Sequence, residues 1–161
     1  MDYKEAQLYE KVEKALQAFF KKDGQLLHIN ANERSISHKV AEHLQDQFSD
    51  LNVDCEYNRR GDQIKKRLDD IQRVFPDIVV HKRGTDSNNY LVIETKKKGR
   101  SLKRDCEKLE EFTGSQYGYN VGLLLVFDVI KKRLSNVLSF QCGKEISGSK
   151  WLKLRDLESE G

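Results

Sequence analysis

The stretch PDIVVHKRGTDSNNYLVIETKKK, residues 76–98, decides the fold of this chain. It holds two apolar runs of strand character, residues 77–81 and 90–96, separated by a loop rich in glycine, asparagine and serine. β-Branched residues favour strands, and a proline such as Pro76 is tolerated where a strand begins. We therefore expect an antiparallel hairpin with a long loop.

Helical and strand patterns surround this hairpin. Apolar residues recur at helical spacing in two segments before it, and Asn32 can cap the second of these helices. A continuous apolar run after the hairpin is typical of a strand covered on both faces. The expected elements, in chain order, are helices over 3–22 and 33–48, strands over 53–57, 77–81 and 90–96, a helix capped by Ser101, and a strand over 121–127.

This order, αβββαβ, predicts an α/β (α+β) fold with a mixed central sheet flanked by helices. The length of 161 residues fits a single domain. We expect its core over about 32–127, an extra N-terminal helix within 1–24 and a C-terminal extension over 128–161. Residues 136–140 of that extension fit either a strand or a helix.

Composition excludes several classes of protein. Apolar residues make up 37% of the chain and charged residues 34%, and no run approaches the roughly 20 apolar residues that a membrane span needs. No secretory signal is visible, and the three cysteines form neither a disulfide framework nor a metal motif, so we expect a cytoplasmic protein. Zinc-protease, P-loop and α/β-hydrolase motifs are also missing from the sequence.

The charge is unevenly distributed. Residues 59–104 carry 14 cationic and 6 anionic side chains, a net +8, which leaves −5 for the rest of a chain of +3. Such a segment is typical of a surface that binds a polyanion, although an ordinary solvated face has the same pattern. The candidates for contact with phosphate groups are Arg59, Arg60, Lys65, Lys66, Lys97, Lys98, Arg100, Lys103 and Arg104.

The hairpin also brings two acids together. If its strands pair, Asp77 at the start of one lies near Glu94 at the end of the other, and Lys96 shares the face of Glu94. Two adjacent carboxylates need a cation between them, and this donor set suits Mg²⁺, with the Thr95 carbonyl as a third ligand. Such a metal lowers the pKa of a bound water, and Lys96 can orient that water or stabilise a phosphate transition state.

Simpler interpretations of these residues stay open. Asp77 can merely cap a turn after proline, and Glu94 and Lys96 can form an ion pair on the surface. Glu56 can be an extra ligand or can pair with Arg59 or Arg60. Glu33 falls near the apolar face at the start of its helix, an unusual place for a charge unless a cation awaits it.

Pro76-Asp77, a spacer of 16 residues and Glu94-Thr95-Lys96 resemble the motif of the PD-(D/E)XK nuclease superfamily, which has the restriction-endonuclease-like fold. The resemblance covers residues 32–127. It implies an αβββαβ core, with Asp77 and Glu94 as metal ligands and Lys96 as the catalytic lysine. It also implies a ligand role for Glu33. The Gln/Tyr motif of some members has no match at the expected place.

The resemblance implies a nuclease that uses Mg²⁺ or Mn²⁺ to hydrolyse phosphodiester bonds, with DNA favoured over RNA and no membrane partner. Two alternatives stay open. One is a catalytically silent module that binds nucleic acid or a partner protein. The other is a structure-specific enzyme such as a junction resolvase, which acts as a homodimer.

Overall fold

The computed structural model describes residues 3–57, 59–60, 63–64, 75–85 and 87–158. Its six-stranded sheet has the order β1-β4-β5-β6-β7-β8 and is mixed, because β5 and β6 run parallel while the other neighbours are antiparallel. The strands are β1 (Asn52–Cys55), β4 (Ile78–His81), β5 (Leu91–Lys97), β6 (Val121–Asp128), β7 (Arg133–Gln141) and β8 (Lys144–Ile146), and β2 (Arg59–Arg60) pairs with β3 (Gln63–Ile64) outside this sheet.

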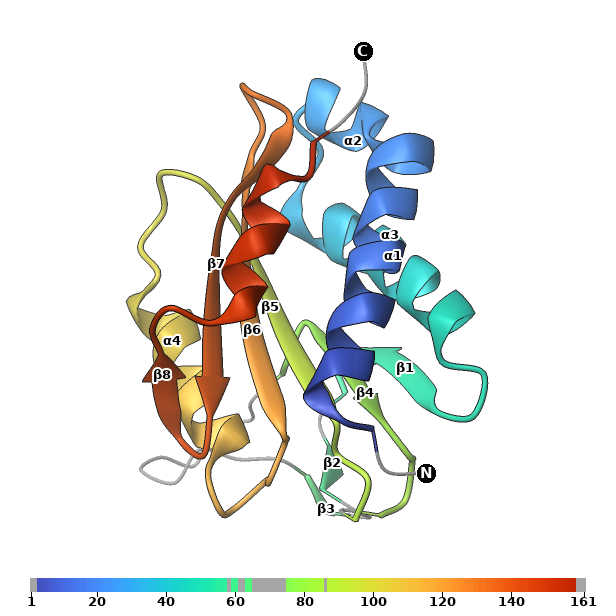
Figure 1. The fold of residues 1–161 in the computed structure, drawn as a ribbon, viewed down its shortest axis with the longest axis vertical. Helices are drawn as coiled ribbons and strands as arrows, with labels where there is room; N and C mark the ends of the chain where they lie inside the picture. The colour runs from blue at the N-terminus through green and yellow to red at the C-terminus, as the bar shows by residue number, and fades with distance from the viewer. Residues whose placement is uncertain (1–2, 58, 61–62, 65–74, 86, 159–161) are drawn as a thin grey trace.

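Helices cover both faces of the sheet (Figure 1). The two faces enclose separate apolar clusters, one under the N-terminal helices and η1, the other under α4. The helices are α1 (Glu5–Asp23), α2 (Gln25–His28), α3 (Glu33–Gln47), α4 (Lys103–Thr113) and the 3₁₀ helix η1 (Lys150–Asp156). No described helix is both long and apolar enough to cross a membrane.

The apolar patterns account for most of these elements. Leu8, Val12, Leu16 and Phe19 of α1 are all buried, and Asn32 caps α3 by accepting a 2.8 Å hydrogen bond from the Ser35 amide. Every residue of β6 is buried, which fits a strand between two apolar layers. The predicted mixed sheet with flanking helices is therefore confirmed.

Two local predictions need correction. Ser101 does not cap α4, because the N-cap residue is Leu102, which makes no side-chain capping bond. Residues 136–140, which fitted either a strand or a helix, belong to β7, so the C-terminal extension enlarges the sheet. Trp151 of η1 is fully buried in the same apolar cluster as the buried residues of α1.

The β5–α4–β6 connection brings α4 close to the sheet. Gly122 of β6 permits this approach, since a Cβ there would lie 2.9 Å from the Thr113 methyl of α4. The helix runs antiparallel to β5, as a crossover between parallel strands requires. Its polar residues therefore face the end of β5, where the candidate site lies.

Candidate active site

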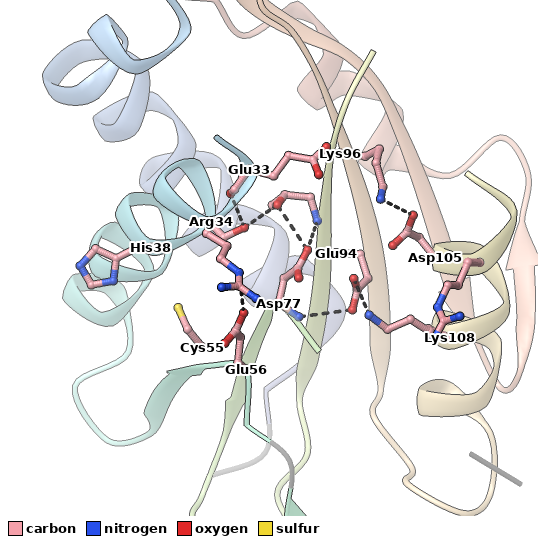
Figure 2. Close-up of a pocket in the computed structure, with 13 residues that line it drawn as sticks. Glu33, Arg34, His38, Cys55, Glu56, Asp77, Glu94, Lys96, Asp105 and Lys108 are labelled. Carbon is pink, nitrogen blue, oxygen red and sulfur yellow. Dashed lines mark hydrogen bonds and ion pairs between the residues drawn. The ribbon is translucent and has the colours of Figure 1, made fainter. Parts of the chain in front are cut away.

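Asp77 and Glu94 lie beside each other where β4 begins and β5 ends, as the hairpin predicted. Strand β4 pairs with β5 in antiparallel register, with Ile78 opposite Ile93. The Asp77 amide donates to Glu94 Oε1 at 3.3 Å, and Asp77 Oδ2 accepts a 2.8 Å bond from the Thr95 amide. These two backbone bonds hold both carboxylates at the same end of the sheet (Figure 2).

Burial makes the charge on both acids costly. The side chain of Glu94 is 1% exposed, and burial together with the charge of Asp77 raises its pKa well above the ordinary value. Burial also raises the pKa of Asp77, although the Thr95 amide and the charge of Lys108 act in the opposite direction. A pair of this kind favours a neighbouring cation.

One cation is already present on α4. Lys108 Nζ lies 2.9 Å from Glu94 Oε2 and donates a second hydrogen bond, at 3.0 Å, to the Phe75 carbonyl. Its side chain is only 13% exposed, so the ion pair is shielded from water. Glu94 therefore pairs with Lys108, and the surface pair of Glu94 with Lys96 is not what this structure contains.

Lys96 instead pairs with Asp105 of α4, at 3.0 Å. Partial burial acts to lower the pKa of Lys96, but the hydrogen bond and charge of Asp105, helped by Glu33 and Asp77, outweigh it and raise this pKa. The ammonium therefore stays protonated at neutral pH. Its chemistry is that of a fixed positive charge beside the carboxylate pair.

Glu33 stands on α3, across the pocket from α4 (Figure 2). Its Oε2 accepts a 2.7 Å hydrogen bond from the Lys97 amide, and Arg100 Nη1 lies 3.8 Å from Oε1. Arg100 is thus the cation that the unusual position of Glu33 led us to expect. The Lys97 amide is a second hydrogen-bond donor to the same carboxylate. One turn farther along α3, the hydroxyl of Ser37 is hydrogen-bonded to that of Thr95.

These side chains surround a cavity of about 480 Å³. Acids outnumber Lys and Arg among the described residues that line it. The acids are Glu33, Glu56, Asp77, Glu94 and Asp105, and the cations are Arg34, Lys96, Arg104 and Lys108. A cavity of this charge suits a cation better than it suits a bare phosphate.

The carboxylate pair fits Mg²⁺ by ligand type. Magnesium is held in proteins by one or two carboxylates, with waters and substrate phosphates in the remaining positions. The Thr95 carbonyl faces the side of Asp77, since both polar groups of a strand residue point to the same neighbour. Within the described ranges, however, no three His, Cys, Asp or Glu side chains form a group able to hold a metal, so Glu33 does not join the pair in this structure.

The predicted phosphate contacts scatter around this cavity. Arg104 lines it, Arg100 borders it through Glu33, and Lys103 is exposed on the first turn of α4. Lys97 Nζ donates to Asn30 Oδ1 at 2.9 Å, and Lys98 lies 3.4 Å from Asp128. Arg59 and Arg60 form β2, but their side chains, like Lys65 and Lys66, lie outside what the structure describes.

Sequence reasoning missed Asp105 and Lys108, the α4 partners of Lys96 and Glu94. Their spacing of three residues sets them on one face of the helix. They lie beside the apolar stripe through Leu109 and Phe112, and this position next to a buried stripe is the sequence feature that could have identified them. Glu56, predicted as an extra ligand or as a partner of Arg59 or Arg60, pairs with Arg34 at 3.2 Å. Elsewhere in the sheet, His81 Nε2 lies 2.8 Å from Asp54.

The chain matches no protein-family model, and a search of curated proteins finds no match either. The fold and the site define an α/β protein with a mixed six-stranded sheet and a charged cavity where β4 begins and β5 ends. Its function has to be argued from the chemistry of that cavity.

Proposed function

We propose that this protein is a nuclease that uses Mg²⁺ or Mn²⁺ to hydrolyse phosphodiester bonds of nucleic acid, with DNA favoured over RNA. The observation that carries the proposal is the pairing of Asp77 and Glu94 through the backbones of adjacent strands, with Lys96 beside them. The order α3-β1-β4-β5-α4-β6 supports assignment to the PD-(D/E)XK type and its restriction-endonuclease-like fold.

Each residue has a distinct task in this mechanism. Asp77 and Glu94 hold the metal, and the Thr95 carbonyl offers a further oxygen. When bound, the metal supplies an activated water and offsets charge on the phosphate. Lys96 remains protonated beside Asp105, so it stabilises the negative charge that develops on the phosphate and does not act as a base.

The first experiment is a cleavage assay with purified protein. Plasmid, linear duplex, single-stranded DNA and RNA are each incubated with Mg²⁺, Mn²⁺ or EDTA. We expect metal-dependent cleavage that is lost in Asp77→Asn and Glu94→Gln, because each variant removes one ionised ligand. Asp46→Asn, at an exposed position of α3 outside the cavity, is the matched control and should cleave like the wild type. Full activity in Asp77→Asn contradicts the proposal.

A silent nucleic-acid-binding or partner-binding module is the second candidate, and one observation favours it. Lys108 already neutralises Glu94, so the acid pair has a cation without any metal. Calorimetric titration with Mg²⁺ separates the two candidates. Binding that disappears in Asp77→Asn supports the nuclease, whereas no binding together with salt-sensitive retention of DNA supports the silent module.

A further inference from the structure

A second cavity, of about 420 Å³, lies where the turn after β5 meets β6, β7 and η1. Four cations line it and, among the described lining residues, there is no acid. The cations are Lys98, Arg100, Arg133 and Arg155. We call this cavity the basic cleft. Its charge is opposite to that of the candidate active site, where acids predominate.

One donor of the Arg133 guanidinium has no hydrogen-bond acceptor among the described residues. Its Nε is buried and has no hydrogen-bond partner among them. An arginine carries five N–H donors, and a buried donor left without a partner is unfavourable. Arg133 also lines the cleft, and guanidinium groups bind phosphate through paired hydrogen bonds, so a phosphate group in the cleft is a suitable partner for this side chain.

Three acids lie next to residues of the cleft: Asp128, Glu33, and Glu158, whose backbone bridges that of Arg133. Asp128 accepts hydrogen bonds from the amides of Ile130 and Lys131, and only its other oxygen approaches Lys98, at 3.4 Å. Arg100 lies 3.8 Å from Glu33 but is 62% exposed. None of these three acids lines the cleft itself, so its described lining is cationic.

The basic cleft adjoins the candidate active site. Arg100 lines the cleft, while Glu33, its partner, lines the active-site cavity. Lys96 of β5 lines one cavity and Lys98, one residue past the end of β5, lines the other; two residues of extended chain span about 6.6 Å. A strand of nucleic acid carries one phosphate per about 3.4 Å of helix axis, so phosphates two apart are separated by about 6.8 Å along it.

We infer that the basic cleft binds the phosphodiester backbone of the nucleic acid whose scissile phosphate lies at Lys96, and so anchors the substrate a short distance from the cut. The inference rests on the proposed function for its choice of nucleic acid over a free phosphate. Arg133 and Arg155 supply the contacts, and Arg100 joins the two cavities. None of these residues takes part in the chemical step.

The test measures binding in EDTA, apart from cleavage. Arg133→Gln with Arg155→Gln is titrated with a labelled DNA duplex and a labelled single strand at several salt concentrations, in the wild-type and Asp77→Asn backgrounds. We expect affinity to fall at least tenfold, with a slope of log affinity against log salt that is smaller by about one to two. Lys14→Gln with Lys144→Gln, which removes two cations outside the cleft, should change neither quantity.

Each outcome decides between the two proposals. If the cleft variant binds nucleic acid with unchanged affinity, the inference about the basic cleft is wrong, even where the wild type cleaves DNA. If the wild type never cleaves nucleic acid and the cleft variant still loses affinity, the result supports binding by the basic cleft and contradicts the nuclease proposal. Pyrophosphate or inorganic phosphate that binds as tightly as the oligonucleotides overturns the assignment to nucleic acid. If the double variant does not fold, Arg100→Gln, at a mostly exposed residue, carries the same test with a smaller expected loss.

Discussion

Lys108 of α4 donates a 2.9 Å hydrogen bond to the buried carboxyl group of Glu94 on β5, and its positive charge opposes the rise in the pKa of Glu94 that burial and Asp77 cause. Glu94 is buried and lies against Asp77, and both effects disfavour its charged form unless a cation is nearby. The ammonium of Lys108 fills that role in this structure. A divalent cation and Lys108 therefore offer alternative ways to neutralise the same group.

The first prediction concerns Lys108→Met. Removal of one partner of a buried ion pair should lower the free energy of unfolding in EDTA by about 3 kcal/mol. Addition of Mg²⁺ should recover part of this loss, because the metal restores a positive charge beside Glu94. Urea denaturation with and without Mg²⁺ measures both effects. Lys103→Met, at an exposed residue of the same helix, should stay within about 0.5 kcal/mol of the wild type.

The second prediction concerns Asp77→Asn in the absence of metal. An acid whose pKa is raised in the folded state ionises more easily in the unfolded chain, so above the unfolded pKa, near 3.9, its charge destabilises the fold. Asparagine keeps an oxygen that can accept the Thr95 amide. The variant should therefore gain on the order of 1 kcal/mol at pH 7 in EDTA and lose the stabilisation by Mg²⁺. Thermal unfolding in both buffers measures the change, and an unstable variant in EDTA contradicts it.

The third prediction separates the charge of Lys96 from its shape. Lys96→Met should lower the rate of single-turnover cleavage by about 100- to 1000-fold, the loss typical of one stabilising group in a transition state. Binding of DNA in EDTA should change little. Lys96→Arg keeps the charge next to Asp105 and should lose much less. Equal rates for the two variants would show that the charge is not what matters.

The fourth prediction concerns Asp54, which lies outside the site. Burial acts to raise its pKa, but hydrogen bonds from Arg83 and His81 outweigh burial and lower it. A lowered pKa contributes stability above the unfolded value of about 3.9 that is lost as the pH falls through the folded pKa. Asp54→Asn should cost about 2 kcal/mol at pH 7, partly because His81 is 2% exposed and loses a partner.

Urea denaturation from pH 7 to pH 2 measures this difference. The gap between the wild type and Asp54→Asn should shrink below about pH 4, as the wild-type carboxylate becomes protonated. Asp46→Asn, at an exposed acid of α3, should show no such gap. A gap that stays constant down to pH 2 would mean that shape, and not charge, gives Asp54 its effect.

The hairpin and its acids could be predicted from sequence, because strand alternation and a single proline determine which residues meet. Asp77 and Glu94 follow from the antiparallel pairing of two local strands, and the Asn32 cap follows from a local hydrogen bond. Lys108 and Asp105 could not be found in this way. Their contacts depend on how α4 is rotated over the sheet, and a search for apolar spacing passes over charged residues on a buried face.

The C-terminal part was also difficult to predict. Strand β7 mixes half-buried and buried residues without strict alternation, and its pairing with β6 shifts register between Val126 and Phe127. An irregular pairing of this kind disturbs the period of two on which strand prediction rests. The basic cleft depends on this same strand, because Arg133 stands at its start.

The two ion pairs between β5 and α4 have opposite sense. Along β5 an acid, Glu94, precedes a base, Lys96, while the antiparallel α4 sets Lys108 against the first and Asp105 against the second. If α4 were displaced by one turn, or laid down in the reverse direction, like charges would meet. The two ion pairs therefore stabilise only one position and one direction of α4 on the sheet. If α4 left the sheet, Glu94 and Lys96 would both lose their ion-pair partners, while the bond from the Thr95 amide to Asp77, which joins the two strands, would not depend on the helix.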